Sequence, residues 1–182
     1  MLPAQCWPWT EAPCLSDRQN LILNRLATEG RKAADYLRTL TGGDWEQQVY
    51  TPGGHPGLRR AGWRVREVLC HFVSTEKIFV RYGKEILAGG EGAPEDFVID
   101  EFNETQVGGM ADRDPAGLIA EFEQRREETR ALAAGMNDAD FDRIGRHPWF
   151  GRVPLDHMLK FVYRHNRLHL RDIKKAIETR QP

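Results

Sequence analysis

Two histidines four residues apart carry the strongest chemical signal in this sequence. They are His165 and His169, in the segment HNRLH near the end of the chain. In an α-helix, residues at positions i and i+4 lie on one face, about 6 Å apart along the axis, so both imidazole rings can reach one ion. Neutral imidazole binds Zn²⁺, Ni²⁺, Fe²⁺ and Cu²⁺. The spacing indicates a divalent-metal site, provided that the segment is helical and both histidines point inward.

The hydrophobic pattern around the pair predicts such a helix, over about residues 153–179. At about 100° per residue its apolar side chains form one continuous stripe, with His169 near the middle and His165 on the edge. The stripe consists of Leu155, Met158, Leu159, Val162, Ile173, Ala176 and Ile177. His157 projects roughly 140° from the stripe centre, so we expect it to face solvent.

A third histidine, His71, belongs to another apolar pattern, which predicts a helix over about residues 63–87. Its core face consists of Val65, Val68, Leu69, Phe72, Phe79, Ile86 and Leu87, and His71 and Thr75 flank this face. A lone inward histidine is more often a core residue with hydrogen-bond partners. Three inward imidazoles each need partners or are costly to desolvate, and one cation satisfies them all. We predict that His71, His165 and His169 bind one divalent metal ion and leave a coordination position open for water or substrate.

Two charged residues are candidates for supporting roles at this site. Glu76 projects near the centre of the apolar stripe of the 63–87 helix, an expensive position for an unpaired carboxylate. It could act as a general base, but the favoured interpretation is a supporting role, either a structural salt bridge for which Arg125 is a candidate partner or a hydrogen bond accepted from a ligand histidine. Arg125 projects inward on a later predicted helix, where it could also bind a carboxylate, sulfonate or phosphate of a substrate.

Four loop residues are weaker candidates. Asn103 and Glu104, in FNETQV, could line the mouth of the site, although an Asn that caps a helix is more common. His55 in GGHPG and His147 in RHPWFG could each be a fourth ligand or a lid residue, but most histidines in loops are merely solvated.

Two further helices complete the pattern. Ser16 and Gln19 have the spacing of a capping box, and apolar residues then recur at alternating spacings of 3 and 4 as far as Leu40. Asp114 and Pro115 are typical of a helix start, and the same spacing follows: Leu118, Phe122, Arg125, Thr129, Leu132 and Met136. A short helical turn is expected over 138–141.

The segment over 44–62 contains too many helix and strand breakers for any regular element, and residues 91–111 form another long connection. Four long amphipathic helices without an alternating strand pattern predict an all-α fold, an antiparallel four-helix bundle with long crossover loops. The bundle is expected over residues 16–182, after an irregular N-terminal arm over 1–15 that holds three prolines and two tryptophans.

Composition excludes several classes of function. With 182 residues one domain is the default, and 26 Lys+Arg against 27 Asp+Glu give a net charge of -1, which argues against nucleic-acid binding. No stretch is long and apolar enough for a membrane span, and the N-terminus lacks the pattern of a secretion signal. The three cysteines form neither a metal motif nor an even disulfide set, so we expect a cytoplasmic protein. A Cys6–Cys14 bridge is the less favoured alternative.

Cys70 and Trp63 have simpler interpretations. Cys70 projects about 100° from His71 and off the core stripe, so we do not expect it to act as a nucleophile. Trp63 is expected to anchor the start of its helix in the core.

The chain resembles the DinB/YfiT-like superfamily of metalloenzymes over most of residues 16–179. The resemblance rests on three segments, GWRVREVLCHFVSTE, FNETQV and HPWFGRVPLDHMLKFVYRHNRLHLRDI. The family pattern of a tryptophan, a histidine and a glutamate corresponds to Trp63, His71 and Glu76, and its final H-x-x-x-H corresponds to His165 and His169.

The resemblance implies an up-down-down-up bundle, bound Zn²⁺ or Ni²⁺, and a homodimer. Relatives with known reactions include mycothiol-dependent maleylpyruvate isomerase and bacillithiol transferases, in which the metal activates a low-molecular-weight thiol. The leading hypothesis is therefore a metal-dependent enzyme, either a thiol S-transferase or a hydrolase, that acts on a small molecule. The alternatives are a non-catalytic metal-binding or stress-response bundle and a dimerising module without metal.

Overall fold

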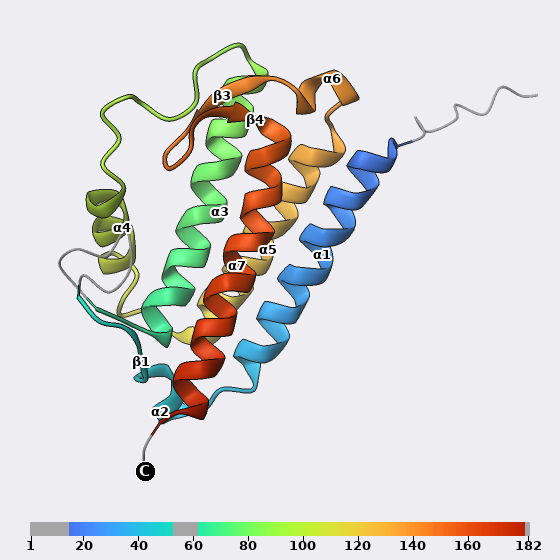
Figure 1. The fold of residues 1–182 in the computed structure, drawn as a ribbon. Coiled ribbons are helices and arrows are strands. Elements are labelled where there is room, and N and C mark those ends of the chain that lie inside the picture. The colour runs from blue at the N-terminus through green and yellow to red at the C-terminus, as the bar shows by residue number, and fades with distance from the viewer. Residues whose placement is uncertain (1–14, 53–61, 181–182) are drawn as a thin grey trace, which may run out of the picture.

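Four long helices form the body of the protein in a computed structural model that describes residues 15–52 and 62–180. These helices are α1 (Asp17–Arg38), α3 (Val65–Leu87), α5 (Pro115–Ala134) and α7 (Leu155–Glu178) (Figure 1). The predicted helix bounds are confirmed to within a few residues. The short helix predicted over 138–141 is also present, as α6 (Asp138–Phe141).

The helices have the up-down-down-up arrangement. Helix α1 packs on α5 and α7, and α3 packs on the same two helices, so the consecutive helices α1 and α3 lie on a diagonal of the bundle. Figure 1 shows α1 and α7 running in one direction and α3 and α5 in the other. Because α3 and α5 are parallel, the segment between Leu87 and Pro115 must run back along the whole length of the bundle before α5 can begin. This requirement explains why that connection is long.

That crossover contains a helix that the sequence pattern did not predict. Helix α4 (Ile99–Gly108) lies within the expected 91–111 loop and packs on α3. Only Asn103 and Val107 of this helix are buried. Two inward residues do not produce a recognisable amphipathic stripe, so the sequence pattern predicted only a long connection here and missed its helix.

The expected 44–62 loop also begins and ends with regular structure. Helix α2 (Gly42–Trp45) precedes strand β1 (Gln48–Tyr50), which pairs antiparallel with β2 (Trp63–Arg64). Strands of two or three residues are too short to show an alternating pattern, and their pairing depends on the start of α3. The segment around His55, residues 53–61, lies outside the described residues.

A hairpin covers the end of the bundle at which α7 begins. Strands β3 (Ile144–His147) and β4 (Gly151–Pro154) pair antiparallel with His147 opposite Gly151. Gly151 has φ +67°, a conformation that favours glycine and allows the tight return. The turn places Trp149 and Phe150 at the surface of this end of the bundle, where they are 47% and 40% exposed.

The start of α1 is capped differently from the prediction. Ser16 Oγ accepts a hydrogen bond from the Gln19 backbone N–H at 3.2 Å, which is the first half of a capping box. The Gln19 side chain does not complete the box. Its amide donates instead to the carbonyls of Ala133, Ala134 and Met136 at 2.8–3.1 Å, at the end of α5. Ala133 and Ala134 are the last two residues of α5 and Met136 follows them, so Gln19 joins the start of α1 to the end of α5.

Cys70 is buried, contrary to its predicted place off the core stripe. Its Sγ lies 3.7 Å from the Met110 carbonyl, in the segment that follows α4. The crossover covers a face of α3 that a bare bundle would leave in water. Burial raises the pKa of the Cys70 thiol to about 11, which agrees with an unreactive thiol.

None of the described helices has the length and apolar character needed to cross a membrane. Residues 1–14, with Cys6, Cys14 and most of the predicted N-terminal arm, lie outside the described residues.

Candidate metal centre

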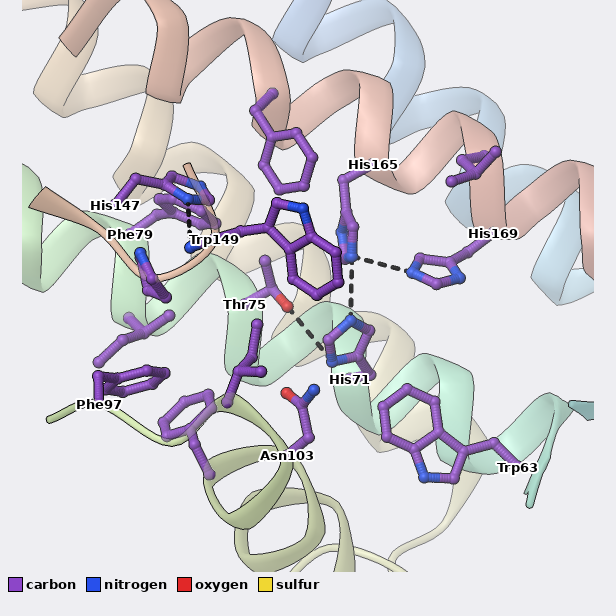
Figure 2. Close-up of a pocket in the computed structure, with 16 residues that line it drawn as sticks. Trp63, His71, Thr75, Phe79, Phe97, Asn103, His147, Trp149, His165 and His169 are labelled. Carbon is purple, nitrogen blue, oxygen red and sulfur yellow. Dashed lines mark hydrogen bonds between the residues drawn. The ribbon is translucent and has the colours of Figure 1, made fainter. Parts of the chain in front are cut away.

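Helices α3 and α7 bring the three predicted histidines together (Figure 2). The Nε2 atom of His165 lies 3.0 Å from Nε2 of His71 and 2.9 Å from Nε2 of His169. His169 is 1% exposed and His71 7% exposed, while His165 is half-buried. The histidine that was predicted to lie mid-stripe is thus the most buried of the three.

The geometry fits a divalent cation. With metal–nitrogen bonds of about 2.0–2.1 Å, two imidazole ligands of a tetrahedral site have their nitrogens roughly 3.3 Å apart. The two distances from His165 Nε2 are within a few tenths of an ångström of that value, and the potential ligand atoms of the three histidines all lie within 4.8 Å of one another. Three imidazole nitrogens that face one point form a donor set for zinc, nickel or ferrous iron.

Two residues hold His169 in the orientation of a ligand. Tyr50 Oη lies 2.6 Å from His169 Nδ1 and 2.8 Å from Asp172 Oδ2. The single phenol proton goes to the carboxylate, so the Tyr50 oxygen accepts a hydrogen bond from Nδ1–H. The Nε2 lone pair of His169 is then directed at the other two histidines. Burial and the nearby Asp172 raise the pKa of Tyr50, which keeps the phenol neutral.

Sequence reasoning missed both supporting residues. Asp172 follows His169 by three residues, so one helical turn puts it on a neighbouring face, and this spacing was an available signal. Tyr50 had no such signal, because it lies on β1, inside the segment that was interpreted as an irregular loop.

His71 has a weaker partner. Thr75 Oγ1 lies 3.5 Å from His71 Nδ1, one helical turn further along α3, at the limit of a hydrogen bond. The Trp63 ring packs 4.8 Å from the His71 ring, and Trp63 is 3% exposed, as a core anchor should be.

A chamber of about 240 Å³ leads to the histidine cluster. Trp149 and Leu168, which are 47% and 41% exposed, form part of its wall, so the chamber reaches the surface of the molecule. Asn103 also lines it, and Figure 2 shows the Asn103 carboxamide pointing toward His71. Glu104, the other residue expected at the mouth, is half-buried and does not line the chamber.

His147 lines the chamber but does not belong to the cluster of potential ligands. The backbone N–H groups of Trp149 and Phe150 donate to its Nδ1 at 2.9 and 3.2 Å. The ring is therefore neutral, with its proton on Nε2. Burial, and then the charge of His157, lower the pKa of His147 to about 4. His157 itself is exposed, as predicted.

Glu76 is fully buried, as predicted, but its partner is Arg126 and not Arg125. Arg126 Nε donates to Glu76 Oε1 at 2.9 Å, and Thr129 Oγ1 donates to Glu76 Oε2 at 2.6 Å. No described contact joins this carboxylate to the histidine cluster. These contacts support the structural interpretation of Glu76.

The predicted inward orientation of Arg125 was wrong. Arg125 is half-buried and forms ion pairs along its own helix, with Glu121 at 3.4 Å and Glu128 at 2.9 Å. From Phe122, the inward stripe continues at i+4 to Arg126, where the sequence pattern had suggested i+3. Both spacings are compatible with a helix, and only the packing partners decide between them.

The fold and this cluster define a class of protein, a four-helix bundle with a three-histidine site. A family model of the DinB superfamily matches residues 25–173, and the chain belongs to this superfamily. A comparison with curated proteins found no match.

Two solved structures share the fold. YfiT from Bacillus subtilis, described as a probable metal-dependent hydrolase with an unusual four-helix bundle topology, has a TM-score of 0.70 at 17% sequence identity, over 93% of this chain and 92% of YfiT. An uncharacterised protein from Escherichia coli UTI89 has a TM-score of 0.65 at 15% identity, over 92% of this chain and 98% of that one. At such identities the likeness concerns the fold.

Proposed function

We propose that this protein is a metal-dependent enzyme that hydrolyses a small-molecule substrate at the three-histidine centre. The observation that carries the proposal is the convergence of the Nε2 atoms of His71, His165 and His169 beside a chamber that reaches the surface. A site open to substrate favours catalysis over storage or a purely structural metal. The description of YfiT as a probable metal-dependent hydrolase agrees with this assignment.

The residues of the chain divide the work. The three histidines hold the cation, and Tyr50 with Asp172 keeps His169 in the ligating tautomer. The Asn103 carboxamide faces the same space and can donate a hydrogen bond to a substrate carbonyl. A bound divalent cation supplies a Lewis acid that polarises a carbonyl and lowers the pKa of water. Zinc and nickel fit the imidazole donors best, and iron is the third candidate.

Thiol transfer at the same centre is the second reaction that the sequence predicted. No lysine, arginine or carboxylate side chain lines the described part of the chamber, so it offers little to a polar or charged thiol. Hydrolysis is therefore the preferred reaction. The homodimer and the cytoplasmic location remain predictions.

Metal analysis of protein purified without a nickel column tests the proposal. We expect close to one zinc or nickel ion per chain, and its loss in His169→Ala. His157→Ala is the matched control, because His157 lies on the same helix and is exposed. If the folded protein contains no metal even after incubation with zinc or nickel, the proposal is wrong. The metal-loaded protein should then hydrolyse members of an ester and amide panel, with activity that chelation removes and zinc restores.

A further inference from the structure

The chamber beside the histidine cluster is lined mostly by apolar side chains. Polar side chains occur at its histidine end, where Thr75 and Asn103 lie, and His147 occurs in the wall. The rest of the described wall is apolar and mostly aromatic: Trp63, Ile78, Phe79, Phe97, Ile99, Phe102, Pro148, Trp149, Phe161 and Leu168. Aromatic walls of this kind stack well on flat apolar groups.

Size limits the occupant. An apolar cavity of about 150 Å³ binds benzene, so the roughly 240 Å³ of this chamber suits one aromatic ring with a short substituent. A sugar-sized polar group would fill the same volume but would leave its hydroxyl groups without partners against these walls.

Charge limits the occupant further. A charged group at the end of the ring away from the histidines would lose its hydration, because no charged side chain among the described residues lines the walls there. A carbonyl is different, since it can lie at the histidine end beside the Asn103 carboxamide.

His147 holds one aromatic wall in place. The Nδ1 atom of His147 accepts the backbone N–H groups of Trp149 and Phe150, which fixes the turn that carries the Trp149 indole. Its ring also packs on Phe79 and Phe161, with centroids 5.0 and 5.1 Å away. His147 is thus a positioning residue that acts on a ligand through Trp149.

We propose that the chamber binds an uncharged substrate with a single aromatic ring, whose carbonyl faces the three histidines, and that His147 sets this specificity by positioning Trp149. The proposal rests on the proposed function for the reaction at the carbonyl, but ring binding itself depends only on the walls.

Three probes test it by ligand-observed NMR and tryptophan fluorescence titration: benzamide, acetamide and benzamidine. Benzamidine has the shape of benzamide with a positive charge, and acetamide has the same carboxamide without the ring. We expect benzamide to bind about tenfold or more tightly than either of the others, with and without bound zinc. Equal affinities, tighter binding of benzamidine, or no binding of benzamide would overturn the proposal.

Two substitutions test the role of His147. His147→Asn keeps an acceptor near the Nδ1 position, and His147→Leu removes it while preserving an apolar side chain. We expect the Leu variant to lose about fivefold or more in benzamide affinity and the Asn variant to retain it, with the zinc content of both unchanged. Equal loss in both variants, or in neither, would contradict the positioning role.

The outcomes separate the two proposals. Benzamide binding by a protein that holds no metal would leave the aromatic chamber intact and remove the proposed hydrolase. A protein that holds one metal ion per chain but shows no preference for benzamide would leave the proposed hydrolase intact and remove the aromatic chamber as its substrate site.

Discussion

At the scale of single residues, the orientation of His169 depends on partners outside the histidine cluster. The Tyr50 hydroxyl oxygen accepts a hydrogen bond from His169 Nδ1–H, and the hydroxyl group donates a hydrogen bond to Asp172. Such supporting contacts hold the ligand ring in one tautomer and one orientation. Their effect should therefore appear in metal affinity before it appears in folding.

Tyr50→Phe and Asp172→Asn should each weaken zinc binding by about 10- to 100-fold, because the orienting hydrogen bonds are lost. Competition titration with a chromophoric chelator measures the change. Tyr36→Phe is the control, since Tyr36 lies on α1 away from the cluster. Unchanged zinc affinity in both test variants would show that the hydrogen bonds that Tyr50 forms with His169 and Asp172 have no part in metal binding.

His147 makes a second prediction at this scale, for stability against pH. Its pKa is lowered from 6.5 in the unfolded chain to about 4 in the folded protein, so the folded state favours the neutral ring. The resulting stabilisation, about 3 kcal/mol, is fully present above pH 6.5 and is lost as the pH falls toward 4. Denaturant unfolding of the wild type and of His147→Asn at pH 7 and pH 4 measures it. Acidification from pH 7 to pH 4 should lower the free energy of unfolding of the wild type by about 3 kcal/mol more than that of His147→Asn, and an equal loss in both proteins would contradict the assignment.

At the scale of elements, the contact between the start of α1 and the end of α5 is the feature that local sequence rules missed. Gln19 is 5% exposed and its amide is shared among three carbonyls. The side chain that would complete a local cap instead satisfies a distant helix end. The hydrogen bonds of the Gln19 side chain to the end of α5 therefore replace the local capping box with Ser16.

Gln19→Ala should lower the free energy of unfolding by about 1–3 kcal/mol, because buried carbonyls lose their donor. Thermal and urea unfolding measure the loss. Gln124→Ala is the matched control, because Gln124 is exposed on α5. If Gln19→Ala lowers the free energy of unfolding by no more than Gln124→Ala does, water replaces the Gln19 amide as a donor to these carbonyls at no cost.

At the scale of the whole molecule, one buried polar network touches all four long helices. Glu76 comes from α3 and Arg126 from α5, and Arg126 also donates to the Leu26 carbonyl of α1 at 2.9 Å and to Asn166 Oδ1 of α7 at 2.8 Å. Gly30 of α1 gives the arginine room, since a Cβ there would lie 3.0 Å from Arg126 Cγ. The network specifies how the helices are arranged around one another.

Glu76→Gln should destabilise the protein by about 3–5 kcal/mol, because it leaves the Arg126 charge buried without its counterion. Arg125→Ala should cost less than about 1 kcal/mol, since its ion pairs are half-exposed. Chemical denaturation compares the two. Zinc content should remain near one ion per chain in folded Glu76→Gln, and loss of metal from folded protein would instead give the carboxylate a role at the site.

The sequence by itself determined the bundle and the identity of the three clustered histidines. Helical periodicity is a local property, so the inward placement of His71 and His169 and the exposure of His157 follow from the residues of single helices. The short elements α2, α4 and the two hairpins were not predictable, because so few of their residues are buried that they leave no periodic pattern.

Only the tertiary structure decided the surroundings of the site. The choice of Arg126 over Arg125 depends on which helices flank α5. The roles of Tyr50 and His147 depend on short strands that bring distant segments to the histidines. The aromatic chamber joins residues from α3, α4, α7 and the β3–β4 turn. Contacts between segments far apart in the chain leave no local period, which is why the three clustered histidines could be predicted and the shape of the site could not.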